Sequence, residues 1–197
     1  MAITRQLIIN LTTSAVGIFL CLVALVTPGW GSIPELFSIS IFYVCFTKSG
    51  ECSATEIYDG DVPLYLILID VQLGGVLAIV LGVVGWLALL VYAISNESSA
   101  SSPVTSGIIL LVASTFESVL LVKFVVFNIM VFKELYKSVQ FILPYSIIIS
   151  IFGLFLIMFT VVRIFIGNRQ RENNHLRTDN SLVITTETYS QLELHRI

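Results

Sequence analysis

Two cysteines, Cys45 and Cys52, are the residues of this chain best placed for covalent chemistry, because they flank the turn-forming sequence Thr47–Gly50. Six residues separate them, so the two thiols would face each other across a hairpin. Two thiols with no histidine nearby do not fill a tetrahedral zinc site, whereas facing thiols in an oxidising compartment form a disulfide. We therefore predict a Cys45–Cys52 disulfide outside the cell. The third cysteine, Cys21, lies in an apolar run and is expected to be a small packing residue.

Charged residues inside apolar runs are the second chemical signal. Asp70, Glu117, Lys123 and Arg163 interrupt such runs, and a charge that faces lipid without a partner is costly. Asp70 and Lys123 fall at similar depths on neighbouring runs, so we predict that they pair. The pair would act as a clamp between helices, and an ion or proton pathway is the alternative.

The other two charges have no evident opposite charge. Glu117 lies near the middle of its run, where it would be protonated, bonded to Ser114 or Ser118, or in contact with another chain. Arg163 lies near the end of its run and is expected to extend its guanidinium to the inner headgroups.

No set of residues typical of an enzyme accompanies these signals. His175 and His195 lie in the polar C-terminal segment, and the sequence contains neither a paired-carboxylate motif nor a Gly-rich phosphate loop. Catalysis needs polar groups that converge in a pocket. We therefore predict a protein that is not an enzyme and that has no cofactor, metal site, small-molecule substrate or nucleic-acid partner.

The elements that position these residues are four long apolar runs. Hydrophobic residues make up 56% of the chain and charged residues 12%, against roughly 25% charged in soluble domains. About 20 apolar residues cross a bilayer as a helix, so we predict an all-α membrane protein, a four-helix bundle over residues 1–166. A cleaved signal peptide is the alternative for the first run, which is longer than a signal peptide's apolar region. The predicted spans are Leu7–Val26, Leu64–Ile94, Val104–Phe132 and Leu143–Ile166.

The basic residues predict the orientation of the spans, because cytoplasmic flanks are enriched in Lys and Arg. Arg5 precedes the first run, and several arginines follow the fourth, whereas residues 29–63 contain one lysine and five acidic residues. We therefore predict a multi-pass plasma-membrane protein with cytoplasmic termini and with outer loops at 27–63 and 133–142. The glycosylation sequons at Asn10 and Asn96 would then face the inside and stay bare.

Two further segments have recognisable patterns. Residues Phe37–Phe46 are rich in β-branched and aromatic side chains, so we predict one strand that enters the hairpin at Thr47–Gly50. The cytoplasmic tail, residues 167–197, is polar and is predicted to be disordered beyond Arg177. Within it, Tyr189 and Leu192 fit a tyrosine-based sorting signal, although such short patterns often arise by chance.

Small residues recur at four-residue spacing within the runs. The second run carries Gly74, Ala78 and Gly82 in this arrangement. Small side chains let helix backbones approach closely in lipid. We interpret these stripes as packing surfaces within the bundle, with contact to a partner protein as the alternative.

The first loop contains an ordered set of aromatic residues and cysteines. Trp30 follows the first span, and Ser40–Cys45 and then Cys52 come after it in the same loop. This order resembles the claudin-like superfamily, which includes claudins, peripheral myelin protein, stargazin-type channel subunits and nematode claudin-like proteins. That family carries a Trp after the first span, then Gly-Leu-Trp-x-x-Cys and a second Cys. Here Phe42 replaces the second Trp and Ser40 replaces the Gly.

The resemblance implies a small, disulfide-bonded antiparallel sheet over the outer end of the bundle, with Trp30 near its base. An interfacial anchor at the outer headgroups is the other interpretation of Trp30.

Three functions are compatible with these features. The first is a structural protein at cell–cell contacts or junctions that associates laterally with itself or with junction proteins through its outer loops. The second is an auxiliary subunit that modifies the gating or trafficking of an ion channel or receptor. The third is a pore-former or transporter, which intramembrane charges alone do not establish. We favour the first. The first outer loop has less strand material than that of a barrier-forming claudin, so the second function remains a strong alternative.

Overall fold

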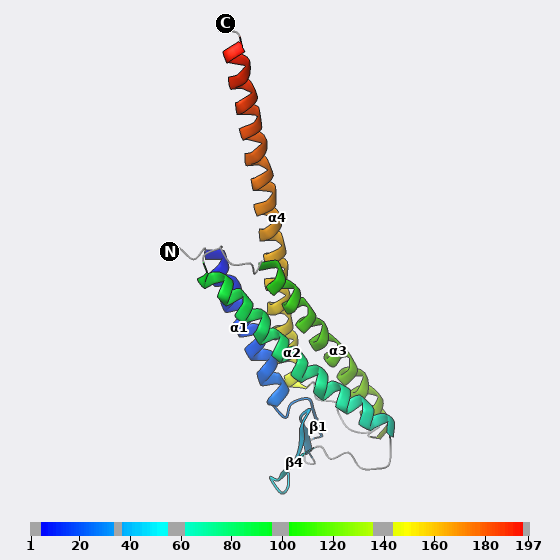
Figure 1. Ribbon diagram of the computed structural model, residues 1–197. Helices are drawn as coiled ribbons and strands as arrows, with labels where there is room; N and C mark the ends of the chain where they lie inside the picture. Colours follow the sequence, from blue (N-terminus) through cyan, green and yellow to red (C-terminus); the bar gives the residue numbers. More distant parts are fainter. Residues whose placement is uncertain (1–4, 34–36, 55–61, 96–102, 136–143, 195–197) are drawn as a thin grey trace.

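The computed structural model describes residues 5–33, 37–54, 62–95, 103–135 and 144–194, and within these ranges it leaves the side chains of 62–70, 127–135 and 171–194, among others, undescribed. Four long helices run side by side: α1 (Arg5–Val26), α2 (Val62–Ile94), α3 (Pro103–Leu135) and α4 (Tyr145–Leu194) (Figure 1). A small sheet lies at one end of the helices, where α1 ends and α4 begins. We call this end the sheet end and the opposite end the far end.

Each helix contains a segment that is long and apolar enough to cross a membrane, in agreement with the four predicted spans. The segments are Arg5–Val26, Val71–Ile94, Pro103–Val126 and Tyr145–Gln170. Large apolar side chains point away from the bundle, for example Phe152 and Phe155, which are 63% and 65% exposed. An apolar helical surface of this kind suits a lipid bilayer, because the hydrocarbon core contains no water to hydrogen-bond with exposed polar groups. The chain is therefore a multi-pass membrane protein in its architecture.

The backbones of α1 and α4 approach closely at Gly17 and Gly153. A Cβ atom added at Gly17 would lie 2.9 Å from the carbonyl oxygen of Gly153, and one added at Gly153 would lie 2.8 Å from that of Gly17. Only glycine fits such a crossing. In α2, Gly82 also faces a neighbouring helix, at Ile18 of α1, whereas a Cβ at Gly74 would meet nothing within 4 Å. The small-residue stripes thus serve packing in part, and Gly74 does not.

The interior of the bundle divides into two apolar clusters. The sheet-end core contains buried residues from α1, α2, α3, α4 and the sheet segment, and the far-end core contains residues from the four helices only. Ile79 of α2 packs against both. The sheet-end core comprises Ala24, Leu25, Trp30, Ile41, Val71, Leu120, Leu121, Phe124 and Ile147, and the far-end core Ile18, Cys21, Leu89, Leu110, Ile157, Val161 and Ile164.

Four short strands form an antiparallel sheet in the order β1-β2-β3-β4. They are β1 (Gly31–Ile33), β2 (Phe37–Ile39), β3 (Tyr43–Phe46) and β4 (Cys52–Ala54). The prediction of one continuous strand over Phe37–Phe46 was therefore wrong, because β2 and β3 form a hairpin with Ser38 opposite Cys45. Period-two patterning cannot reveal this break, since the residues of the turn are themselves apolar.

In the C-terminal segment, α4 continues as a helix to Leu194, and the disorder expected beyond Arg177 stays a prediction. Figure 1 shows this part of α4 extending away from the other helices. Beyond Gly167 the sequence contains no glycine and no proline up to Leu194, so nothing in it breaks the helix. The side chains of the sorting-signal residues Tyr189 and Leu192 lie outside the described residues.

Candidate functional site

Trp30 joins the sheet to the helices. Its side chain is 0% exposed, and its indole Nε1 donates a hydrogen bond to the carbonyl oxygen of Ala24 in α1 at 2.6 Å. Its ring meets that of Phe124 in α3 edge-on, with 4.9 Å between centroids, a favourable aromatic geometry. The predicted place of Trp30 at the base of the sheet is present in the structure. A ring that protein covers completely does not serve as an anchor in the headgroups, so that alternative was wrong.

The turn between β2 and β3 also points into the bundle. Ile41 at this turn is 0% exposed and belongs to the sheet-end core, and Phe42 packs against that core. The backbone of the turn closes through a hydrogen bond from the Ser40 N–H to the Tyr43 carbonyl oxygen at 2.8 Å. Gln72 of α2 donates its side-chain N–H to the carbonyl oxygen of Ile41 at 2.9 Å. The turn is apolar because it inserts between helices, and Gln72 donates to one of its buried carbonyl oxygens.

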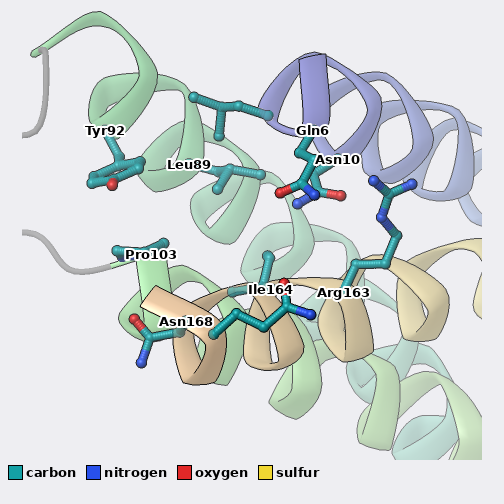
Figure 2. A pocket seen from close by; sticks show the side chains of 11 residues that line it. Gln6, Asn10, Leu89, Tyr92, Pro103, Arg163, Ile164 and Asn168 are labelled. Atoms are coloured by element: carbon teal, nitrogen blue, oxygen red, sulfur yellow. The ribbon is translucent and has the colours of Figure 1, made fainter. Parts of the chain in front are cut away.

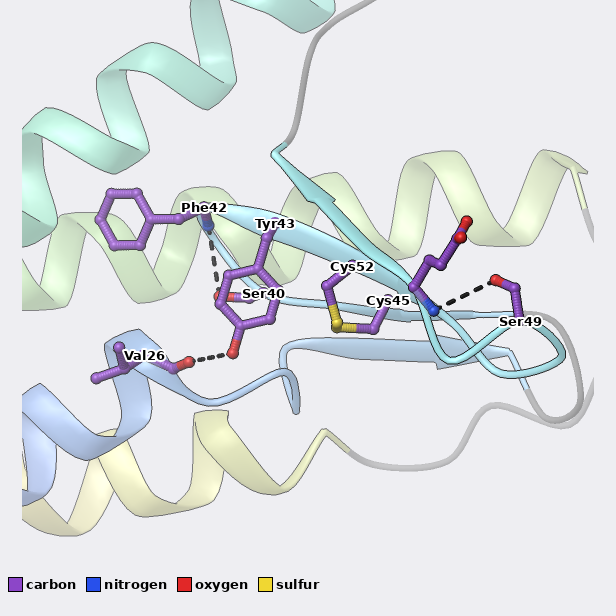
Figure 3. Close-up of a disulfide and its surroundings, with 8 residues drawn as sticks. Val26, Ser40, Phe42, Tyr43, Cys45, Ser49 and Cys52 are labelled. Atoms are coloured by element: carbon purple, nitrogen blue, oxygen red, sulfur yellow. Dashed lines mark hydrogen bonds between the residues drawn. A yellow bond between two sulfur atoms is a disulfide. The ribbon is translucent and has the colours of Figure 1, made fainter.

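Hydrogen bonds at the ends of α1 and α4 fix the sheet further. The Tyr43 hydroxyl donates to the carbonyl oxygen of Val26, the last residue of α1, at 2.5 Å (Figure 3). The hydroxyls of Thr27 and Ser146 lie 2.7 Å apart, and the Ser146 N–H donates to the carbonyl oxygen of Gly29 at 3.1 Å. The sheet is therefore bonded to α1, and the segment that leads into it is bonded to α4.

The disulfide joins β3 to β4, the last strand in the sheet order. Cys45 of β3 and Cys52 of β4 are partners in register, and the predicted bond joins them, with their Cα atoms 4.1 Å apart (Figure 3). The turn between them closes with a hydrogen bond from the Gly50 N–H to the Phe46 carbonyl oxygen at 2.9 Å. Gly50 has a φ of 69°, which glycine adopts without strain.

This second turn is exposed throughout. All residues from Phe46 to Cys52 are exposed, and Phe46 remains 47% exposed although it is aromatic. Lys48 and Glu51 add one charge of each sign to the same surface. A cross-linked turn held on an anchored sheet loses little conformational entropy when it binds a partner. The arrangement is suited to protein contact, and it brings together no set of groups for catalysis.

Glu117 lies in the middle of the bundle and is 2% exposed. The Ser150 hydroxyl of α4 donates a hydrogen bond to its Oε1, whereas Oε2 has no hydrogen-bond partner in the described part of the chain. Neither Ser114 nor Ser118, the partners considered from the sequence, bonds the carboxyl group: their hydroxyls donate to the carbonyl oxygens of Leu111 and Ser114, respectively.

Sequence reasoning missed Ser150 as the partner of Glu117. Glu117 and Cys21 border a cavity of about 10 Å³ that touches residues from all four helices, a volume at the limit of what one water needs. In the predicted spans, Glu117 and Ser150 differ in depth by eight residues, or about 12 Å at ~1.5 Å per residue, so depth alone does not reveal this pair. Cys21 is buried, as expected of a packing residue.

The other charged residues predicted within the spans are Asp70, Lys123 and Arg163. The side chain of Asp70 lies outside the described residues, so its pairing with Lys123 stays a prediction. Lys123 is exposed on α3 and lines a groove of about 280 Å³ between α2 and α3. Arg163 is half-buried at the far end, with its guanidinium carbon 5.6 Å from the centroid of the Phe159 ring.

Two further observations concern modification and metals. Asn10 is 8% exposed within α1, so its sequon is inaccessible on either side of a membrane and offers no check on topology. Asn96 lies outside the described residues. No group of three or more metal-ligating side chains occurs among the residues that the structure describes.

No protein-family model and no curated protein sequence matches this chain. The geometry of the described residues therefore carries the functional argument.

Proposed function

We propose that this chain is a non-enzymatic plasma-membrane protein that organises contacts between membrane proteins at cell borders through its disulfide-bonded sheet, in the manner of a claudin-like four-span protein. The termini are cytoplasmic in this proposal, and the sheet lies outside the cell. The observation that carries it is the pairing of a buried apolar anchor, at Trp30 and Ile41, with an exposed cross-linked turn around Phe46. The cross-link holds the exposed turn in one conformation, which lowers the entropy cost of contacting another protein.

A co-culture experiment tests this proposal. Cells that lack the protein are made to express it with either of two fluorescent labels and are mixed with non-expressing cells. We expect enrichment at borders where both cells express the protein, and less at borders with non-expressing cells. Uniform distribution over the surface of all cells would contradict a contact role.

Matched variants of the exposed turn make the test specific. Phe46→Ser removes the exposed ring, and the hydrogen bonds of this residue in the turn come from its backbone, so folding is preserved. Lys48→Ser alters a neighbouring exposed position and serves as the control. We expect Phe46→Ser to lower border enrichment and Lys48→Ser to leave it near the wild-type level. Equal behaviour of the two variants would exclude Phe46 as the contact residue.

The second candidate function is an auxiliary subunit of a channel or receptor, and the groove between α2 and α3 favours it. Leu73, Gly74, Phe116 and Lys123 are among the residues that line this groove. A groove on the lipid-facing surface fits a helix of another membrane protein.

Gly74→Leu separates the two candidates, because a Cβ atom at Gly74 meets nothing within 4 Å and the larger side chain would occupy the groove that Gly74 lines. If the auxiliary role holds, surface delivery depends on one co-expressed channel and Gly74→Leu weakens that dependence. If the contact role holds, border enrichment is unchanged by the same variant.

A further inference from the structure

A pocket of about 170 Å³ lies at the far end of the bundle, where segments of all four helices meet. Figure 2 shows that Gln6 and Asn10 of α1 face Arg163 of α4 across it. Tyr92 of α2 and Pro103 of α3 complete the wall. The volume is below the roughly 300–1,000 Å³ of pockets for drug-sized ligands, so it suits one small polar group.

Arg163 provides the positive charge of this pocket. It is half-buried within the membrane-spanning segment Tyr145–Gln170, and no described residue that lines the pocket is acidic. The planar guanidinium matches the oxygens of a phosphate group, to which it donates two parallel hydrogen bonds. The pocket therefore favours an anion, and a phosphate fits its one cation best.

Asn10 provides a second, independent indication of a ligand. Its side chain is 8% exposed and points into the pocket (Figure 2), yet its Oδ1 has no hydrogen-bond partner among the described residues. A buried polar atom without a partner is costly, and an oxygen acceptor requires a donor. A ligand that carries an O–H or N–H group near its anionic group would supply this donor.

The surroundings of the pocket suit a lipid. Leu89 and Ile164 contribute apolar side chains to its wall, and Phe165 and Ile166 on the same stretch of α4 are exposed apolar residues. Acyl chains could lie against such a surface while the headgroup enters the pocket. Pockets with basic residues between transmembrane helices at the membrane edge are typical sites for anionic headgroups.

We propose that this pocket binds a hydroxyl-bearing phosphate ester, with the phosphate on Arg163 and the ester's hydroxyl donating to Asn10. An anionic phospholipid with a hydroxylated headgroup is one source of this chemistry, and a soluble phosphate ester is the other. The site is independent of the contact function and of the orientation of the chain. It requires only that the four helices cross a bilayer.

The test uses the full chain in a mild non-ionic detergent, with lipid binding counted by native mass spectrometry. Dioctanoyl phosphatidylglycerol carries the phosphate and hydroxyls, dioctanoyl phosphatidylmethanol keeps the phosphate without a headgroup hydroxyl, and dioctanoyl phosphatidylcholine has no net charge. We expect affinity to fall in that order. Equal affinity for phosphatidylglycerol and phosphatidylcholine would overturn the proposal, and equal affinity for the two anionic lipids would overturn the role of Asn10.

Glycerol phosphate distinguishes the two sources. If it displaces phosphatidylglycerol at a comparable concentration, the site stands and its ligand is a soluble ester. If it fails to compete at a large excess, the site stands and the acyl chains contribute to binding.

Matched arginine variants show whether the pocket itself is responsible. Arg163→Gln should weaken binding of phosphatidylglycerol by about tenfold or more, because it removes a charge-assisted contact. Arg169→Gln changes an exposed arginine of the same helix that does not line the pocket, and should change the affinity by less than about twofold. Equal losses in both variants would show a diffuse surface charge effect and overturn the site.

A further variant keeps the test valid if Arg163→Gln does not fold. Gln6 is exposed at the pocket, so Gln6→Glu should fold while its carboxylate competes with the phosphate for Arg163. We expect weaker binding of phosphatidylglycerol by this variant. Unchanged binding would overturn the proposal.

Discussion

The two ends of the helix bundle are built differently. At the sheet end, Trp30 and Ile41 are 0% exposed, and the Trp30 indole and the Ile41 carbonyl oxygen both form hydrogen bonds to helix residues. At the far end, the buried Asn10 Oδ1 has no partner among the described residues, and a pocket of about 170 Å³ lies beside it. The contrast is between buried polar groups that are satisfied at the sheet end and a buried oxygen without a partner beside a pocket at the far end, where we propose that a ligand binds.

The largest effect is expected at the sheet end, from Trp30→Ala. Removing a fully buried tryptophan costs about 3–5 kcal/mol of unfolding free energy, and here the hydrogen bond to Ala24 is lost as well. Trp86→Ala is the matched control, because Trp86 is half-buried, packs against the far-end core and bonds Leu11 of α1. Thermal unfolding in detergent should show the greater loss for Trp30→Ala. Equal losses of thermal stability in the two variants would show that the sheet end is anchored no more firmly than the far end.

The disulfide should contribute less than the anchor. In the chain-entropy model, closing a ring of this size stabilises by roughly 2.5 kcal/mol. Cys45→Ser and Cys52→Ser should each reduce surface delivery, and the double variant should be little worse than either single one. Helix content measured by circular dichroism should change little, because Trp30 and Ile41 anchor the sheet independently. Additive defects would show that the two cysteines act separately.

The crossing of α1 and α4 tests the packing between the two ends. Gly153→Ala places a Cβ atom 2.8 Å from the Gly17 carbonyl oxygen and 2.7 Å from the Cys21 Sγ atom, and overpacking of this kind costs about 1–3 kcal/mol. Gly74→Ala is the control, because it meets nothing within 4 Å. We expect a lower thermal midpoint for Gly153→Ala alone. A matching decrease for Gly74→Ala would point to helix backbone effects in place of the crossing.

The smallest effect on stability is expected at the far end, from Asn10→Leu. This change removes a buried oxygen that has no partner in the described structure, so the ligand-free protein should be unchanged or more stable by up to about 1 kcal/mol. Binding of phosphatidylglycerol should weaken in the same variant. A destabilisation as large as that of Trp30→Ala would show that Asn10 is structural, and the contrast between the ends would fail.

The helices could be predicted from the sequence because an uninterrupted apolar run of this length has few alternatives. The disulfide could also be predicted, because the two cysteines flank a short turn-forming sequence and would therefore face each other. The break at Ser40–Phe42 was not, since an apolar turn is rare and its cause is the insertion of Ile41 among helices that are distant in sequence. The contact of Glu117 with Ser150 also depends on how α3 and α4 are rotated, which the spacing of residues does not specify.

The orientation of the sheet is the central claim, and one substitution tests it directly. Thr47→Asn creates a glycosylation acceptor sequence over positions 47–49, in a turn that is exposed throughout. The chain's own acceptor, Asn96, comes two residues after the end of α2 in the sequence. We predict that the variant gains one glycan, seen as a glycosidase-sensitive mass increase, and that the wild-type chain carries none. A glycan on the wild-type chain with none added by Thr47→Asn would place the sheet inside the cell and contradict the proposed function.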